Sequence, residues 1–249
     1  MATKSSSNFY ACHFMSAPDL NDYDMQVKEM YLPLIQELYH QTLLVEDAPM
    51  AYLQRIHGIG LADIRHFKLG FCNRQLGKQL PSYRKMEGVK LRGALSHLKI
   101  LHSSGHEAFR GCVTVPVFWQ NEIVGYYGER IERAQRGAPS YYWHPIGHLA
   151  VFNLDNVSSN DVLYFCQSPL IAIQMMKALD GKVIATDPHY TLQRSDIESL
   201  VAMGVKELCF VKSAEVSPIT LMQLSKQLAA CGIRYSAMKL DMGGAYGTA

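Results

Sequence analysis

The last third of the sequence alternates short apolar runs with single helical segments, and this alternation constrains the fold more than any other feature. The apolar runs have the composition of buried strands, and we predict strands at residues 162–166, 182–186, 207–211 and 233–240. Between them, apolar residues recur at the spacing of one helical face. Because a single helix joins each strand to the next, right-handed crossovers onto a mostly parallel sheet are the favoured topology.

The segments between these strands carry start and stop signals for helices. Two of them open with a serine followed by a proline, Ser168-Pro169 and Ser217-Pro218, which suits an N-cap residue and the first helical position. A glycine follows each of the three predicted helices: Gly181, Gly204 and Gly232. We therefore expect an α/β architecture for this part of the chain.

Candidate functional residues follow from this topology, because ligands of parallel sheets bind outside the carboxyl ends of the strands. These residues are Gln167 after the first strand, Asp187 after the second, and Val211, Lys212, Ser213 and Glu215 at the end of the third. Most of them are not acidic.

The order and spacing of these elements resemble the toprim domain of bacterial DnaG-type primases. In that family a Glu follows the first strand and an Asp-x-Asp pair ends a later one. These acids hold the divalent ions of phosphoryl transfer, because hard cations prefer oxygen ligands. Here Gln167 takes the place of the Glu, and Val211-Lys212-Ser213 takes the place of the Asp-x-Asp, at the spacing of the family.

The replacement of all three acids implies a pseudoenzyme, for which no metal ion or other cofactor is expected. Val211 has no ligand atom, while Gln167 and Ser213 are neutral and weak ligands. Lys212 adds a positive charge where a dication would sit. The resemblance therefore implies a retained frame without its catalytic side chains.

Two alternatives stay open for this segment. It is an ordinary doubly wound domain without kinship to primases, or it carries a rewired site. In the rewired site Asp187 and Glu215 would share one Mg²⁺ or Mn²⁺ ion and support a residual nuclease or nucleotidyltransferase activity.

Upstream, the patterns predict a mixed α+β lobe. Helices are expected at 23–45 with an interruption at Pro33, at 47–56 with Asp47 as its cap, and at 61–67. Apolar alternation on both sides of a short polar link then predicts a β-hairpin.

Three segments of this lobe also resemble the amino-terminal half of the DnaG catalytic core. They are residues 52–71, the two hairpin strands 109–117 and 123–131 around Gln120-Asn121, and residues 141–145. The resemblance thus covers nearly the whole chain. Family members add a zinc-ribbon domain and a helicase-binding domain, and neither is expected here.

In the family this half supplies basic side chains that track the template strand. Arg110 is kept, whereas Glu129 takes the place of a hairpin Arg and Arg130 lies on the opposite face of the strand. A Lys and an Asn near the family's active centre correspond to Ser140 and Trp143. Polar positions are lost while apolar framework positions stay, which points to binding or scaffolding.

Basic residues beside aromatic rings are typical of single-stranded DNA binders, in which charges follow the phosphates and rings stack on bases. The candidate nucleic-acid-binding residues are Arg84, Lys85, Arg110, Arg130, Arg133, Trp143 and Lys212. Two simpler interpretations stay open. The basic residues form an ordinary solvated surface, and the aromatic residues pack between the two lobes. DNA, expected to be single-stranded, and proteins of replication or of mobile elements are the candidate partners, and an adaptor that does not touch DNA stays open.

Composition limits the partners and the location. The net charge is only +2, so a nucleic-acid surface must be a local patch. Six scattered cysteines without a C-x-x-C pair favour reduced thiols, and no apolar run is long enough for a membrane span, so we expect a cytoplasmic protein. The predicted organisation is a tail at 1–22, a basic subdomain at 23–155, a degenerate toprim-like domain at 156–242 and a tail at 243–249.

Overall fold

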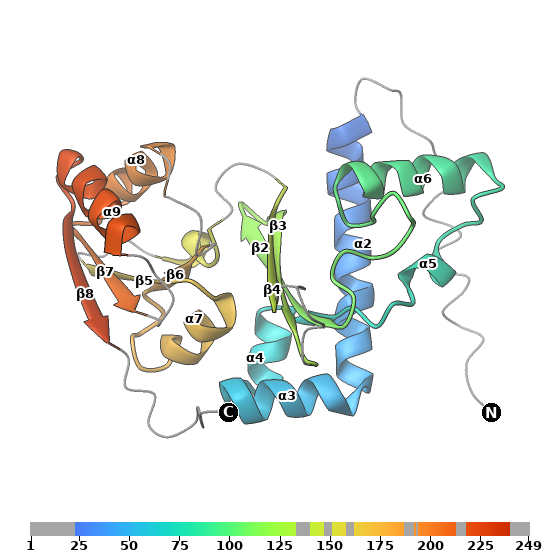
Figure 1. Cartoon of the computed structure of the whole chain (residues 1–249), viewed down its shortest axis with the longest axis horizontal. Coiled ribbons are helices and arrows are strands. Elements are labelled where there is room, and N and C mark those ends of the chain that lie inside the picture. The colour runs from blue at the N-terminus through green and yellow to red at the C-terminus, as the bar shows by residue number, and fades with distance from the viewer. Residues whose placement is uncertain are drawn as a thin grey trace.

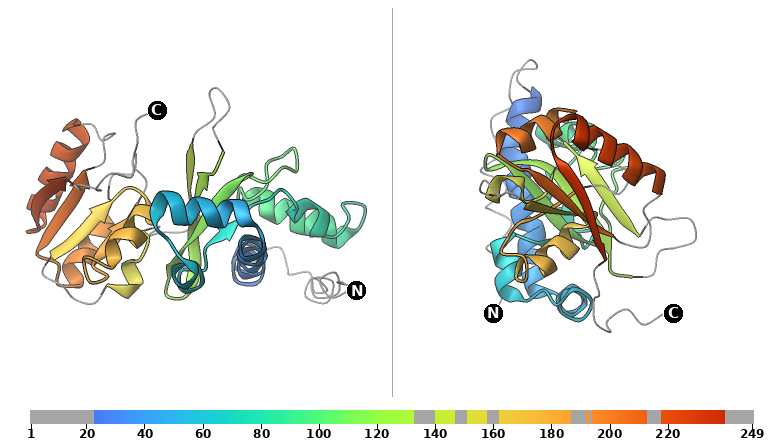
Figure 2. Two further views of the ribbon diagram at one scale, coloured as in Figure 1. Left: turned by 90° about the horizontal axis from the view of Figure 1, so that it is seen from below. Right: turned by 90° about the vertical axis from the view of Figure 1, so that its left-hand side faces the viewer.

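Two four-stranded sheets lie side by side along the long axis of the molecule, each with helices packed against it (Figures 1 and 2). The structure is a computed structural model, and it describes residues 23–132, 140–146, 151–157, 162–186, 192, 194–212 and 218–239. Within these ranges, no helix combines the length and the apolar content that a membrane crossing requires.

The first sheet is antiparallel, with the strand order β1-β2-β3-β4. Its strands are β1 (Gly70–Phe71), β2 (Cys112–Trp119), β3 (Glu122–Arg130) and β4 (Tyr141–Pro145). Between β2 and β3, Gln120 and Asn121 have φ angles of 50° and 67°. Positive φ at both positions is the geometry of a type I′ turn, and Trp119 pairs with Glu122 across it, so the predicted hairpin and its turn are confirmed.

Helices cover both faces of this sheet. They are α2 (Tyr23–Val45), α3 (Asp47–His57), α4 (Leu61–His66), α5 (Leu76–Gln79) and α6 (Met86–His97). Tyr39 of α2 and Leu95 of α6 belong to the buried cluster on one face, whereas Leu53 of α3 and Ile64 of α4 belong to the cluster on the other face.

The second sheet has the order β6-β5-β7-β8, and all of its paired strands are parallel. Its elements are the short helix η1 (Leu154–Asn156), β5 (Val162–Cys166), α7 (Pro169–Met176), β6 (Val183–Ala185), α8 (Arg194–Ala202), β7 (Glu207–Lys212), α9 (Pro218–Ala230) and β8 (Arg234–Lys239). An antiparallel bridge joins Phe152 to Ala185 at the edge. The expected fold class, a mixed lobe followed by an α/β unit with a mostly parallel sheet, is confirmed.

Successive side chains of the central strand point to opposite faces of the parallel sheet. Leu163 and Phe165 lie in a cluster with residues of α8 and α9, whereas Cys166 lies in a cluster with residues of α7. Figure 1 shows the same division, with α8 and α9 on the outer side of the sheet and α7 on the side of the antiparallel sheet.

One buried cluster spans both sheets. It contains Val113 and Val115 of the antiparallel sheet, Leu170 of α7 and Val183 of the parallel sheet, and each of these side chains is fully buried. Because the apolar faces of the two sheets share this core, helix α7 is packed as a common layer between them.

Two local predictions are wrong. Helix α2 runs without interruption through Pro33, which lies on its exposed side. There, solvent can hydrate the carbonyl group that loses its partner. The residue that precedes α3 as its N-cap is Glu46, so Asp47 is the first helical residue rather than the cap. Its carboxylate is then in the first turn, where it still favours the helix dipole.

Candidate functional site at the junction of the two sheets

The carboxyl end of the parallel sheet brings two predicted site positions to the same edge. Gln167 directly follows β5, and Val211 lies near the end of β7. The two strands are neighbours, with Phe165 of one opposite Phe210 of the other. The spatial relation that we expected for these two positions is therefore present.

The two described positions of this edge carry no negative charge. Val211 is 3% exposed and belongs to the same buried cluster as Cys166 and Leu170. Gln167 is 8% exposed and neutral. Within the described ranges, no three side chains of His, Cys, Asp or Glu come together in a group that could hold a metal ion.

Other predicted positions lie outside the described residues. The gaps between the described ranges contain Asp187, Ser213, Glu215 and Arg133. For Lys212, only the strand backbone is described. Their assignments therefore stay predictions.

Helix α7 connects this edge to the antiparallel sheet through Ser168. Ser168 is the N-cap residue of α7 and Pro169 is its first residue, as predicted. The serine side chain does not cap the helix, however. Its Oγ donates a hydrogen bond to the hydroxyl oxygen of Tyr127 at 3.3 Å, which links α7 to β3.

Tyr127 contacts the carboxylate of Glu129, which is 17% exposed and accepts three hydrogen bonds. The hydroxyl of Tyr127 donates to Oε2 at 2.7 Å, and the hydroxyl of Tyr52 donates to Oε1 at 2.6 Å. Nε2 of His57 donates to the same Oε1 at 2.7 Å. We call these linked side chains the junction network; its members are Glu129, Tyr127, Tyr52, His57 and Ser168.

The charge of Glu129 is stabilised inside the junction network. Burial alone would raise the pKa of Glu129, but the hydrogen bond and charge of His57, together with the two tyrosine hydroxyls, outweigh it and hold the pKa below its ordinary value. Burial and the nearby carboxylate raise the pKa of Tyr127, so its hydroxyl stays a donor. Glu129 is thus engaged inside the network, whereas Nδ1 of His57 is buried without a hydrogen-bond partner among the described residues.

The sequence offered only a weak signal for the junction network. Glu129 stood out because it replaces an Arg, but its partners Tyr52 and His57 are more than 70 residues away. Both partners lie in the segment 52–71 that resembles the primase core. Their convergence depends on how α3 packs on the sheet, which the residue pattern alone does not give.

Two predicted DNA-binding residues are engaged within the protein. The guanidinium group of Arg130 donates to the carbonyl oxygen of Arg110 at 3.1 Å and to the hydroxyl of Tyr142 at 2.6 Å, and it lies 5.6 Å from the centre of that ring. Trp143 is half-buried and meets Tyr127 edge to face at a ring distance of 5.7 Å. These side chains have packing roles that any binding of DNA would have to share.

Arg84 and Lys85 lie on the surface, in the loop before α6. The neighbouring Tyr83 is 66% exposed, and the guanidinium group of Arg84 lies 5.9 Å from the centre of its ring. We call Tyr83, Arg84 and Lys85 the exposed basic loop. The sequence pattern did not single out Tyr83, although its position beside two basic residues was a usable signal.

Helix α6 fixes the backbone that precedes the exposed basic loop. Arg92 of α6 donates to the carbonyl oxygens of Gly77 at 2.8 Å and of Pro81 at 3.4 Å. Gly88 lies against the same segment: a Cβ atom there would lie 2.7 Å from the oxygen of Pro81 and still closer to that of Ser82. The loop backbone therefore approaches α6 as closely as a glycine permits.

The change Gly88→Ala should lower the free energy of unfolding by about 1–3 kcal/mol, because the new methyl group meets backbone atoms that cannot move aside cheaply. Urea denaturation at neutral pH measures this loss. The matched control is Gly93→Ala in the same helix, where a Cβ meets nothing within 4 Å. That change should be neutral or stabilising by up to about 1 kcal/mol, because alanine favours a helix. Equal effects of the two changes would contradict the close packing at Gly88.

No protein-family model matches the sequence. No curated protein sequence matches it either.

Solved structures do match the fold. The zinc-binding and RNA polymerase domains of the Aquifex aeolicus primase have a TM-score of 0.70 at 16% identity, over 90% of this chain and 57% of that chain. A DnaG primase catalytic domain bound to single-stranded DNA has a TM-score of 0.66 at 15% identity, over 88% of this chain and 75% of that one. The RNA polymerase domain of Mycobacterium tuberculosis DnaG with double-stranded DNA has a TM-score of 0.61 at 14% identity, over 89% and 74%.

These matches confirm the resemblance in the fold. This chain has the fold of DnaG primase catalytic cores along about nine tenths of its length, and it spans little more than half of the Aquifex aeolicus chain.

Proposed function

We propose that this protein is a catalytically degenerate relative of the DnaG primase core that binds DNA without copying it. The observation that carries the proposal is the pair Gln167 and Val211 at the carboxyl ends of β5 and β7. In a primase-like frame, these are the positions of two metal-holding acids. An amide and a buried alkyl group occupy them instead.

The loss of catalysis follows from the chemistry of the ions. Mg²⁺ and Mn²⁺ neutralise the charge that develops on the phosphates, and they need several charged oxygen ligands to stay in place. Gln167 supplies one neutral oxygen at most and Val211 supplies none. Ser213, the third replaced position, adds a hydroxyl group, which is a weak ligand. The alternative of a rewired site at Asp187 and Glu215 concerns two residues outside the described ranges, and it stays a second candidate.

DNA binding is supported by a surface and by the neighbours. The exposed basic loop presents two cationic side chains beside an open aromatic ring, which suits phosphates and an unstacked base together. Structural neighbours with the same fold have been solved with single-stranded and with double-stranded DNA. We favour single-stranded DNA, because the ring of Tyr83 can stack on an unpaired base, whereas the bases of a duplex are stacked on each other.

The wider setting belongs to the same proposal. A core that has lost its catalytic acids would act by binding DNA or other proteins. We therefore propose that it works with proteins of replication or of mobile elements, in the cytoplasm. Five cysteines of the described residues are free thiols, which fits a reducing compartment.

The binding of a fluorescent single-stranded 20-mer, measured by anisotropy at several salt concentrations, tests the proposal. The logarithm of affinity should fall with the logarithm of salt, and the double change Arg84→Ala with Lys85→Ala should reduce that slope by about 0.7 for each phosphate that these two side chains neutralise. Tyr83→Ala should weaken binding by about tenfold, since one stacked base contributes about 1–3 kcal/mol. Lys226→Ala, an exposed lysine on α9, is the matched control and should have no effect.

Two results would overturn the proposal. A salt slope near zero would indicate an adaptor that does not touch DNA. Template-directed primer synthesis by the purified protein with Mg²⁺ or Mn²⁺, lost in Gln167→Ala, would show that the catalytic function persists.

A further inference from the structure

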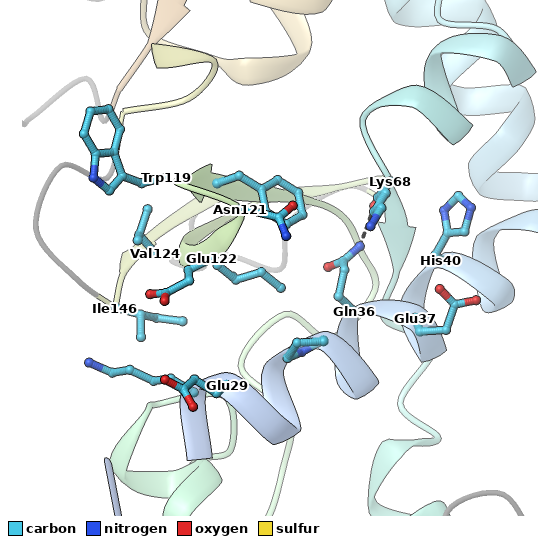
Figure 3. Close-up of a pocket in the computed structure, with 14 residues that line it drawn as sticks. Glu29, Gln36, Glu37, His40, Lys68, Trp119, Asn121, Glu122, Val124 and Ile146 are labelled. Carbon is cyan, nitrogen blue, oxygen red and sulfur yellow. Dashed lines mark hydrogen bonds between the residues drawn. The ribbon is translucent and has the colours of Figure 1, made fainter. Parts of the chain in front are cut away.

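A cavity of about 570 Å³ lies between helix α2 and the tip of the β2–β3 hairpin (Figure 3). This volume is in the range of sites that hold small organic ligands. The apolar part of its lining consists of Pro33, Phe118, Trp119, Ile123, Val124 and Ile146. Two of these side chains are aromatic, and none comes from the strand ends at Gln167 and Val211.

A β-bulge shapes the wall that β3 contributes. Val117 pairs with Gly125 and Phe118 pairs with Ile123, so Val124 is an extra residue in the ladder. The bulge exchanges the two faces of the strand beyond it. Ile123 therefore joins the buried cluster under α2, whereas Val124 packs against the opposite cluster. The hairpin tip leaves the regular sheet at this point, beside the cavity.

A buried amide on α2 lines the cavity. Gln36 is only 3% exposed, and its Nε2 donates to the carbonyl oxygen of Lys68. That bond fixes the amide, and its Oε1 is buried without a partner among the described residues. Figure 3 shows this oxygen turned away from Lys68, on the side of Asn121 and Glu122. An unpaired buried acceptor is costly, so this oxygen suits a ligand that donates a hydrogen bond.

Further acceptors line the same cavity. Nδ1 of His40 lies 2.7 Å from the carbonyl oxygen of Leu69, and because a carbonyl only accepts, this nitrogen carries the proton. In the neutral ring, Nε2 is then an acceptor. The charged side chains of the lining are Lys28, Lys68, Glu29, Glu37 and Glu122. Three carboxylates against two ammonium groups make the site unfavourable for an additional anion.

We propose that this cavity binds an amino-substituted nitrogen heterocycle of the adenine or cytosine type, as a nucleoside or as an unstacked base. The flat ring would lie against Trp119, because Phe118 is the next residue of the strand and packs on the other side of it. An exocyclic amine would donate to Oε1 of Gln36. The excess of carboxylates means that phosphate groups add nothing to the affinity. This inference goes beyond the proposed function, because it concerns a base-recognising cavity that needs neither a metal ion nor the exposed basic loop.

Fluorescence of Trp119 tests the proposal directly. The chain contains two tryptophans, so Trp143→Phe leaves Trp119 as the single reporter. Titration of this protein with adenosine or cytidine should quench the emission in a saturable way, because a base would stack on the indole ring. Uridine, which has no exocyclic amine, should bind more weakly. Adenosine monophosphate should bind no more tightly than adenosine.

Two variants in the reporter background give the decisive comparison. Gln36→Leu removes the acceptor and should weaken adenosine binding by about tenfold, the cost of one unmade hydrogen bond. Ile146→Phe fills the cavity without removing a polar group, so it should abolish binding and remains informative if the first variant does not fold. Glu87→Gln, on the surface of α6 outside the cavity, is the control and should bind like the parent.

The source of the base is decided by a third titration with a single-stranded oligonucleotide of cytidines. Quenching by the oligonucleotide that Ile146→Phe removes identifies a base within a strand, whereas quenching by the nucleoside alone identifies a free ligand. Absence of saturable quenching with every probe at millimolar concentration would overturn the proposal. Undiminished quenching in Ile146→Phe would overturn it as well.

Discussion

Replacing Glu129 with alanine should lower the free energy of unfolding by about 3–5 kcal/mol, because a largely buried carboxylate that accepts three hydrogen bonds leaves its partners unsatisfied when it is removed. His57, which is 4% exposed, would lose its acceptor along with the hydroxyl groups of Tyr52 and Tyr127. Urea denaturation at pH 7 measures the effect. The matched control is Glu122→Ala, an exposed glutamate at the start of the same strand, and it should change stability by less than about 0.5 kcal/mol.

The pH dependence of the same residue provides an independent check. The pKa of Glu129 is held below its ordinary value in the folded protein, so the unfolded chain takes up the proton first as the pH falls. The stabilisation is therefore complete above the pKa of the unfolded carboxyl and is lost as the pH falls through the lower pKa of the folded state. Glu129→Gln should flatten this acid limb of the stability curve. A loss of less than about 1 kcal/mol in Glu129→Ala, or an unchanged acid limb in Glu129→Gln, would contradict the junction network as described.

Val211→Asp should destabilise the protein by at least about 3 kcal/mol, although it introduces the residue type that the resemblance to primases implies for this position. The side chain is 3% exposed in an apolar cluster, and an unpaired carboxylate there has lost its hydration. Desolvation would raise the pKa of the new carboxyl, so the deficit should grow as the pH rises above the ordinary pKa of an aspartate. Mg²⁺ should not restore the lost stability, because Gln167 offers no second charge.

Thermal and urea unfolding with and without Mg²⁺ measure the effect of Val211→Asp. The control is Val201→Asp on α8, where the valine is 45% exposed and the new carboxylate stays hydrated. This change should cost less than about 1 kcal/mol. If Val211→Asp folds like the parent and Mg²⁺ raises its melting temperature, the strand end is still a competent metal site. The proposal of a degenerate core would then fail.

The parallel sheet was accessible from the sequence because its signals are local. Each strand is a short apolar run, and residues such as Ser168 and Pro169 mark where a helix begins. The hairpin turn at Gln120 and Asn121 was predictable for the same reason. Pro33 misled the prediction, because a rule about helix interiors does not tell whether the affected carbonyl group faces solvent.

The candidate sites were only partly accessible, because they depend on contacts between distant segments. Gln167 and Val211 could be paired because strand order places the ends of neighbouring strands together. The junction network joins β3 to α3 and to the start of α7, and the cavity at Gln36 joins α2 to the hairpin tip. An isolated Gln on the apolar side of a helix gives no sign that its oxygen lacks a partner.

The packing of α7 between the two sheets has a consequence for how the molecule takes hold of a ligand. Proteins that close on a substrate move two domains relative to each other about a seam with few contacts. Here the seam is filled by side chains such as Val115 and Leu170 that belong to one continuous interior. Within the described residues the two sheets therefore form one packed body, and we expect a ligand to bind to surfaces that this packing has already fixed.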